Sequence, residues 1–87
     1  MEKLWSDKGW DGYLYWYATD KKTFEKINKL LKDIERNGVS QGIGKPEKLK
    51  HDYSGFWSRR IDEKNRLVYK IDDDGYLNIA ECKGHYK

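Results

Sequence analysis

An apolar stripe in the first half of the chain is the feature that most limits how it can fold. From residue 20 to residue 37, large apolar side chains recur every three or four positions, with lysine and glutamate between them. The stripe consists of Phe24, Ile27, Leu30, Leu31 and Ile34. This spacing predicts an amphipathic helix with one buried side. Thr19 or Asp20 can cap its start, and Asn37 followed by Gly38 is a typical helix end.

A weaker helical pattern precedes this stripe. Its apolar positions are Trp10, Tyr13, Leu14 and Tyr17, after a possible N-cap at Ser6 or Asp7. Gly9 and Gly12 weaken the pattern, since a glycine inside a helix costs about 1 kcal/mol relative to alanine. We expect an antiparallel pair of helices and assign both stripes to packing.

The second half of the chain predicts a sheet. Residues 38–46 form a glycine-rich connector, and alternating segments separated by turns follow at 47–50, 56–62, 66–72 and 76–82. Leu4 and Trp5 can add a short first strand. We therefore expect one domain over residues 1–87 with an α+β fold, in which two N-terminal helices pack on a twisted, mainly antiparallel sheet of about five strands.

The alternation around residue 67 predicts which side chains face the helices. Leu67, Tyr69 and Ile71 share one parity, so they should lie in the core. A three-residue loop at 63–65, with Asn65 in the left-handed conformation, would place Ile61 opposite Leu67.

That register has consequences for the arginines. It leaves Arg60, Asp62 and Arg66 together on the open face of the sheet, with the two arginines diagonal to each other. Arg59 then has the parity of the core, together with Trp57, which we assign to packing. Arg59 must therefore reach out from the edge of the core, or the strand must bulge.

Positive charge is concentrated in the same region. Residues 45–70 hold eight Lys or Arg against four acids, a net charge of +4, although the whole chain carries only +3. A solvated charged face would explain such a cluster. However, Tyr53, Phe56 and Trp57 lie among the cations, and this mixture is typical of surfaces that bind a nucleic-acid backbone and stack its bases.

A carboxylate, an arginine and a histidine together have the chemistry to cut RNA without a metal or cofactor. The carboxylate can accept the proton of the 2′-hydroxyl, the arginine can neutralise charge at phosphorus, and the histidine can protonate the leaving oxygen. The chain places one carboxylate, Glu47, among several basic residues of the segment 42–66, and it carries a histidine at position 85. Glu47 and His85 have a plain structural reading as well: Glu47 as a strand-edge carboxylate, and His85 as a frayed terminal residue.

Cysteine and histidine usage argues against a disulfide or a zinc site. Cys82 is the single cysteine, and His51, Cys82 and His85 do not match any zinc spacing. We expect Cys82 to be a small buried apolar residue. The sequence shows no signal segment and no apolar run of the roughly twenty residues that a membrane span requires, so we expect a cytoplasmic protein with no membrane partner.

Several motifs along the chain resemble the YoeB-type toxins of the RelE superfamily. They are Leu4-Trp5-Ser6, Tyr13-Leu14-Tyr15-Trp16, Gly44-Lys45-Pro46-Glu47, Ser54-Gly55-Phe56-Trp57-Ser58-Arg59-Arg60-Ile61, Arg66-Leu67-Val68-Tyr69 and the ending His85-Tyr86. The resemblance implies a RelE-like fold, similar to microbial ribonucleases, whose open face enters the ribosomal A site and cuts mRNA. It also implies an acidic antitoxin as partner, and homodimers.

The resemblance further implies roles for individual residues. Glu47 matches the general base, Arg66 the phosphate-stabilising arginine and His85 the general acid. The expected substrate-binding residues are Lys50, His51, Arg60 and Tyr86, of which Tyr86 is associated with the substrate base. His51 lacks a catalytic counterpart in the family, and we read it either as a residue that supports the site or as a phosphate contact. The chain departs from the pattern in the loop after residue 37, at Lys48, and at Lys87 beyond the terminal tyrosine.

Two other functions use the same surface. One is a non-catalytic nucleic-acid-binding module or corepressor, which needs the basic cluster but neither Glu47 nor His85. The other is a catalytically inactive relative that only binds an antitoxin.

Overall fold

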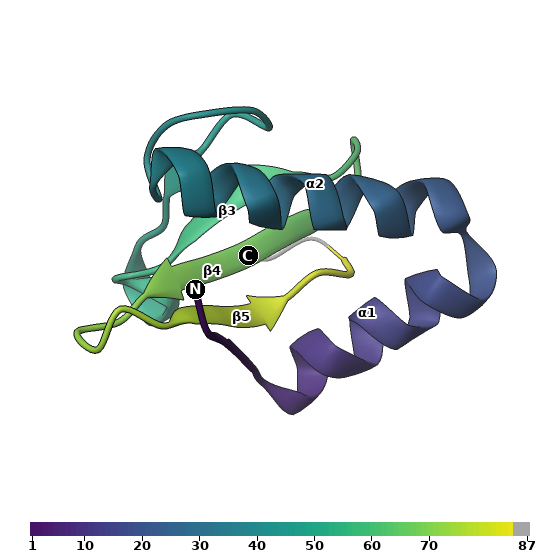
Figure 1. The fold of residues 1–87 in the computed structure, drawn as a ribbon, viewed down its shortest axis with the longest axis horizontal. Coiled ribbons are helices and arrows are strands. Elements are labelled where there is room, and N and C mark those ends of the chain that lie inside the picture. Colours follow the sequence, from purple (N-terminus) through teal and green to yellow (C-terminus); the bar gives the residue numbers. More distant parts are fainter. Residues whose placement is uncertain (85–87) are drawn as a thin grey trace.

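The computed structural model describes residues 1–84 and shows one sheet with two helices packed against it (Figure 1). The elements are β1 (Lys3–Trp5), α1 (Asp7–Thr19), α2 (Lys21–Asn37), β2 (Glu47–Lys48), the 3-10 helix η1 (His51–Tyr53), β3 (Trp57–Arg60), β4 (Arg66–Ile71) and β5 (Leu77–Glu81). The strand order is β1-β5-β4-β3-β2, with β1 parallel to β5 and the other neighbours antiparallel. The expected α+β fold is confirmed. Neither helix in the described part of the chain is long and apolar enough to cross a membrane.

The helix α2 begins and ends close to the residues that the sequence predicted. The Asp20 side chain accepts a hydrogen bond from the Thr23 backbone N–H (3.2 Å), and Gly38 ends the helix with a positive φ of 87°. Four residues of the stripe are buried: Ile27, Leu30, Leu31 and Ile34. They pack on the inner face of the sheet, where Leu67 and Tyr69 are buried as expected and the partly buried Trp57 joins the same core.

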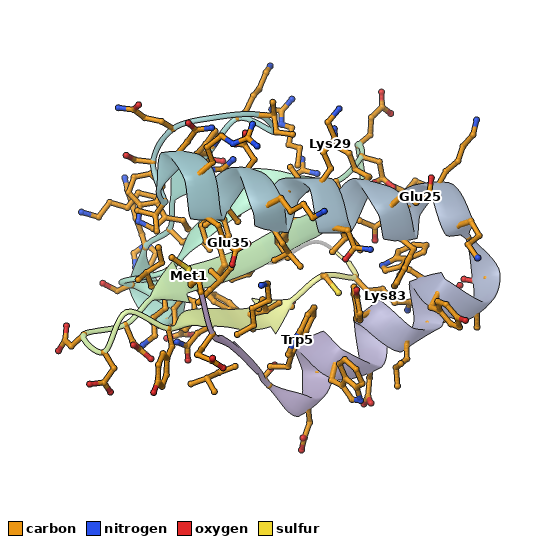
Figure 2. All side chains as sticks on the ribbon, in the orientation of Figure 1. Met1, Trp5, Glu25, Lys29, Glu35 and Lys83 are labelled. Carbon is orange, nitrogen blue, oxygen red and sulfur yellow. The ribbon has the colours of Figure 1, made fainter. Side chains whose placement is uncertain are left out.

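The N-terminal strand is tied to α2 by charge. Glu35 accepts a hydrogen bond from Lys3 Nζ (3.0 Å) and pairs with the amino group of Met1 (3.4 Å). Figure 2 shows Glu35 of α2 next to Met1. These contacts hold the edge strand β1 against the helix that covers the sheet.

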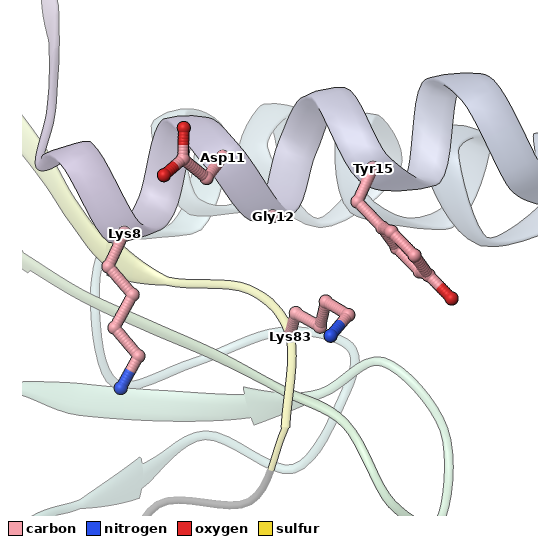
Figure 3. Close-up of a pocket in the computed structure, with 5 residues that line it drawn as sticks. All are labelled: Lys8, Asp11, Gly12, Tyr15 and Lys83. Carbon is pink, nitrogen blue, oxygen red and sulfur yellow. The ribbon is translucent and has the colours of Figure 1, made fainter.

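The two glycines of α1 mark the side on which this helix meets β5. A Cβ at Gly9 would lie 2.6 Å from the backbone oxygen of Ile79, and a Cβ at Gly12 would lie 3.1 Å from Cys82 Sγ. Figure 3 shows Gly12 on the side of α1 that faces the segment carrying Lys83. The glycines that weaken the helical pattern are therefore the residues that let α1 approach the sheet.

The assignment of the α1 stripe to packing is wrong for three residues. Trp10 (44% exposed), Leu14 (45%) and Tyr17 (57%) lie largely in solvent, because the glycines and not the aromatic residues face β5. Tyr13 is turned inward and packs against the core.

The predicted register of β3 and β4 is also wrong. Arg59 lies opposite Leu67, and Arg60 lies directly opposite Arg66 instead of diagonally. The connecting loop is longer than expected because the Asp62 side chain accepts from the backbone N–H groups of Lys64 (2.8 Å) and Asn65 (2.7 Å). Asp62 therefore belongs to the loop and not to the open face of the strand. Asn65 has no positive φ; among the described non-glycine residues only Lys45 and His51 do.

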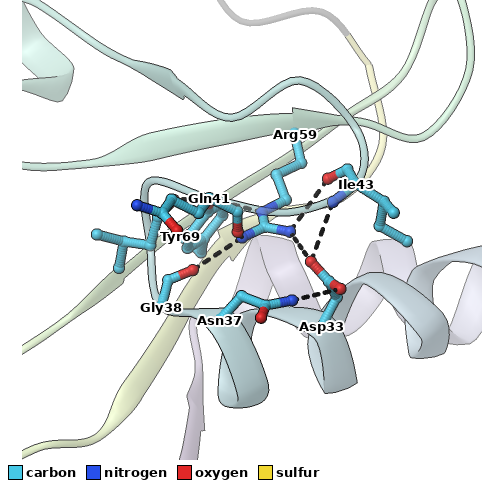
Figure 4. Close-up of polar contacts among 8 residues, drawn as sticks. Asp33, Asn37, Gly38, Gln41, Ile43, Arg59 and Tyr69 are labelled. Atoms are coloured by element: carbon cyan, nitrogen blue, oxygen red, sulfur yellow. Dashed lines mark hydrogen bonds and ion pairs between the residues drawn. The ribbon is translucent and has the colours of Figure 1, made fainter.

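Arg59 neither reaches out from the core edge nor requires a bulge in β3. Its side chain is fully buried, and all five of its N–H donors have partners (Figure 4). The acceptors are the hydroxyl of Tyr69 (2.9 Å), a carboxylate oxygen of Asp33, and the backbone oxygens of Gly38 (2.8 Å), Gln41 (2.6 Å) and Ile43 (3.1 Å). The glycine-rich loop is thus wrapped around a buried guanidinium group.

The close approach at Gly9 leads to a first prediction. Gly9→Ala should lower the free energy of unfolding by about 1–3 kcal/mol, because the added methyl group overlaps a backbone oxygen that cannot rotate away. Alanine is otherwise the better helix former by about 1 kcal/mol. Urea denaturation should show this loss, while Asp11→Ala, at an exposed position of the same helix, should leave stability nearly unchanged. Equal stability of the two variants would contradict direct packing of Gly9 on β5.

The Arg59–Asp33 pair predicts acid sensitivity. Hydrogen bonding to Arg59 holds the pKa of Asp33 below its ordinary value of 3.8. The pair therefore stabilises the fold fully above about pH 4, and this contribution is lost as the pH falls through the folded-state pKa. The melting temperature of Asp33→Asn should consequently fall less between pH 6 and pH 2.5 than that of the original chain.

A matched control is Asp73→Asn in the exposed turn between β4 and β5, which should keep the acid sensitivity of the original chain. Identical acid dependence of Asp33→Asn and Asp73→Asn would show that the ion pair does not control this transition.

Candidate active site

The register of the sheet brings three predicted site residues to one face. Glu47 lies opposite Ser58, and Arg60, two residues after Ser58, lies opposite Arg66. Antiparallel partners share a face and alternate residues return to it, so Glu47, Arg60 and Arg66 all lie on the face away from α2. Glu47 and Arg60 are exposed, and Arg66 is half-buried.

Arg66 is held by the loop that precedes it. Its Nη1 donates to the backbone oxygens of Asp62 (2.7 Å), Glu63 (3.2 Å) and Asn65 (3.2 Å). Within residues 1–84, Nε and Nη2 make no recorded hydrogen bond. The guanidinium is therefore fixed through one nitrogen, while the other two can donate to an anion such as a phosphate.

The segment around Glu47 is bordered by two unusual backbone conformations. Lys45 (φ 51°) and His51 (φ 58°) both adopt the left-handed region, which costs energy for residues other than glycine. The strand between them is anchored at its start, because the backbone N–H of Arg60 donates to the oxygen of Gly44 (2.7 Å). Strain of this kind is concentrated at functional sites in many proteins.

Lys50 and His51 lie in the turn that follows β2. Lys50 precedes η1, and its backbone oxygen accepts from Tyr53 N–H (3.2 Å), while the oxygen of His51 accepts from Ser54 N–H (3.0 Å). Both side chains are exposed. The structure thus places these two predicted contacts on a compact turn and records no hydrogen bond from either side chain to Arg60 or Arg66.

The remaining predicted residues, His85 and Tyr86, lie outside the described residues. The last described residue, Gly84, donates from its backbone N–H to Asn65 Oδ1 (2.8 Å) and accepts from the backbone N–H of Arg66 (3.1 Å). The chain is therefore bonded to the start of β4 immediately before His85.

Glu81 is a residue of this face that the sequence did not single out. It is buried, its Oε1 pairs with Lys8 Nζ (3.4 Å), and its Oε2 accepts a hydrogen bond from the Tyr53 hydroxyl. That hydrogen bond raises the pKa of Tyr53. Glu81 thereby ties the η1 turn, which carries Lys50 and His51, to β5 and α1.

A signal for Glu81 was present in the alternation of β5. Leu77 and Ile79 point into the core, so an acid at position 81 has a core parity that it cannot satisfy there. The sheet resolves this conflict with a register shift between β4 and β5, which pairs Val68 with Glu81 and Tyr69 with Ile79.

Cys82 takes no part in this face. It is buried as predicted, and burial raises the pKa of its thiol to about 12, so the reactive thiolate is not populated near neutral pH. In the described part of the chain, His, Cys, Asp and Glu side chains form no cluster of three or more that could hold a metal ion.

Comparison with known proteins agrees with this architecture. A family model described as "YoeB-like toxin of bacterial type II toxin-antitoxin system" matches residues 5–86. Toxin YoeB of Escherichia coli K12 is 56% identical over 86 residues, which cover 99% of this chain and 100% of the relative.

Solved structures agree as well. The toxin in a heterotetrameric YoeB-YefM toxin-antitoxin complex from Staphylococcus aureus has a TM-score of 0.91 at 49% identity, and so does a YoeB dimer from the same organism. Each match covers 99% of this chain and 98% of the other. This is the small α+β architecture of toxin–antitoxin toxins. The chain belongs to the YoeB-like toxins of bacterial type II toxin–antitoxin systems, which confirms the resemblance seen in the sequence.

The Tyr53–Glu81 contact predicts how the η1 turn is held. Tyr53→Phe removes the hydroxyl donor to a buried carboxylate and should lower the free energy of unfolding by about 1–3 kcal/mol. Backbone amides of residues 50–54 should also exchange faster with deuterium, as measured by mass spectrometry. Tyr76→Phe, at an exposed tyrosine before β5, is the control. Equal exchange in both variants would show that Glu81 does not hold the turn.

Proposed function

We propose that this toxin is a metal-independent endoribonuclease that cuts mRNA in the ribosomal A site. Glu47 is the general base, His85 is the general acid, and Arg66 stabilises charge at phosphorus. The substrate-binding residues are Lys50, His51, Arg60 and Tyr86. The observation that carries this proposal is the common face of Glu47, Arg60 and Arg66, which follows from the strand register.

The cleavage step needs no reagent besides the RNA and these side chains, and only the later hydrolysis of the cyclic phosphate consumes a water molecule. Glu47 takes the proton of the ribose 2′-hydroxyl, whose oxygen then attacks the adjacent phosphorus. Arg66, with Arg60 and Lys50, neutralises the charge that develops on the phosphoryl oxygens. The bond from phosphorus to the 5′-oxygen breaks, and His85 gives this oxygen a proton. The products are a 2′,3′-cyclic phosphate, or the 3′-phosphate after hydrolysis, and a 5′-hydroxyl.

Dependence on the ribosome follows from the openness of the site. Glu47 and Arg60 are exposed, and the two-residue strand β2 offers little surface to hold a flexible RNA in line for attack. In-line geometry can supply a large part of a rate enhancement. The ribosome can impose this geometry on the codon, whereas a small open face cannot.

The partners follow from charge and from the relatives. An acidic antitoxin that covers the face of Lys50, Arg60, Arg66 and His85 would block access to RNA and neutralise the basic surface. The Staphylococcus aureus relatives occur with YefM and as a dimer, which supports an antitoxin and a homodimer here. Activity on translating ribosomes requires a cytoplasmic location.

The test is cleavage of a defined mRNA on programmed ribosomes, mapped by primer extension. We expect a cut within the A-site codon and no cut when the attacking nucleotide carries a 2′-deoxy sugar, because the nucleophile is then absent. Glu47→Gln, Arg66→Ala and His85→Ala should each lower the rate by roughly a hundredfold or more. Lys64→Ala, in the exposed loop beside Arg66, should cleave normally.

Three results would argue against the proposal. Equal rates and cut sites on free RNA would indicate a general ribonuclease. Cleavage of the 2′-deoxy substrate would exclude the 2′-hydroxyl as nucleophile. Ribosome binding without any cleavage would favour the non-catalytic alternative.

A further inference from the structure

A pocket of about 340 Å³ lies between α1 and the segment that follows β5 (Figure 3). It is lined by Lys8, Asp11, Gly12, Tyr15 and Lys83. Its size is at the lower end of the range typical of small-molecule sites. None of its side chains has a role in the function proposed above.

Two of the lining residues, Tyr15 and Lys83, contact each other through an aromatic ring and an ammonium group. Lys83 Nζ lies 4.6 Å from the centre of the Tyr15 ring, and Tyr15 is 45% exposed. The Trp16 ring packs edge-on against Tyr15 at 5.0 Å, and Trp16 Nε1 donates to the Cys82 backbone oxygen (2.9 Å). Tyr15 is therefore a supported platform with part of its surface open.

Two sets of contacts connect the pocket to the candidate active site. Lys8 pairs with Glu81, which accepts from Tyr53 on the turn that carries Lys50 and His51. Lys83 precedes Gly84, whose backbone oxygen accepts from Arg66 N–H. The pocket is therefore next to the segment that is bonded to Arg66, a proposed phosphate ligand.

The lining residues indicate which ligand fits. Two ammonium groups beside an accessible aromatic ring are the combination that binds single-stranded nucleic acid, since the cations meet phosphates and the ring stacks a base. Asp11 adds an acceptor for a base amino group, and no cation within residues 1–84 lies within ion-pair distance of it.

We propose that this pocket binds a nucleotide of the RNA that flanks the cleaved phosphodiester, with Tyr15 stacking on its base and Lys8 and Lys83 contacting phosphates. This inference rests on the proposed function, because it takes RNA to be the ligand of the neighbouring face. It assigns to α1 a substrate-binding role that the catalytic residues do not provide.

The chain offers a matched control for this pocket. Tyr17 and Lys21 form a second tyrosine–lysine pair on the helical region, with Nζ 5.5 Å from the ring centre, and neither residue lines the pocket. The double variants Tyr15→Ala/Lys83→Ala and Tyr17→Ala/Lys21→Ala therefore lose the same chemical groups. Circular dichroism melts of both verify folding.

The measurement is fluorescence anisotropy with a labelled single-stranded octanucleotide of 2′-O-methyl RNA, which cannot be cleaved by 2′-hydroxyl attack. The pocket variant should raise the dissociation constant at least about fivefold, while the control variant stays within about twofold of the original chain. Lys83→Ala alone should reduce the slope of log K against log salt concentration by about 0.7, the value of one phosphate contact on a single strand.

Cleavage on programmed ribosomes, measured in parallel, separates this inference from the proposed function. If the original chain cleaves normally and the two double variants have equal dissociation constants, the pocket is not an RNA site and the proposed function still stands. If the original chain does not cleave mRNA but only the pocket variant loses affinity for the octanucleotide, the proposed function is overturned and the pocket assignment stands. The RNA assignment would also be overturned if the original chain did not bind the octanucleotide. It would be overturned as well if the pocket variant lost affinity for an acidic peptide but not for the octanucleotide.

Discussion

The buried guanidinium of Arg59 is the interaction on which the arrangement of this protein depends. A buried charge is tolerated only when it is paired and fully hydrogen-bonded, and Arg59 meets both conditions through Asp33, Tyr69 and three backbone oxygens of the glycine-rich loop. The same strand alternation that sends Arg59 inward sends Arg60 outward. The network that fixes the loop therefore also fixes the direction of an arginine on the candidate active face.

The elements set by local rules could be predicted from the sequence. The α2 stripe and the burial of Tyr69 each depend on side chains a few residues apart, and both are found in the structure. The sequence offered two candidates for each N-cap, and the structure selects Ser6 over Asp7 and Asp20 over Thr19. The common face of Arg60 and Arg66 was predicted as well, although by a loop of the wrong length. This prediction is correct because the register of β3 against β4 differs from the expected one by two residues, and a shift of two residues leaves every side chain on the same face.

The features set by distant contacts could not be predicted. The partners of Arg59 come from α2, from Tyr69 of β4 and from the glycine-rich loop, which we read from the sequence as a connector. The inward side of α1 is defined by Gly9 against the backbone of β5, so the exposed Trp10 looked like core. Glu81 reaches the open face only because β5 shifts register. The acid at a core-parity position signals a conflict, but the shift that relieves it depends on pairing with β4, which lies about ten residues earlier in the sequence.

The pairing of β1 with β5 also constrains when the protein can fold during its synthesis. Residues 3–5 lie beside residues 77–79, and the seat of α1 is built from β5 and the residues after it. These contacts have a large sequence separation, so a growing chain can form α2 by itself but cannot complete the sheet until β5 has been made. An incomplete chain would expose Tyr13 and Trp16, the two aromatic residues of α1 that pack against the core. The basic face is therefore not fully assembled until residues 77–81 have been synthesised.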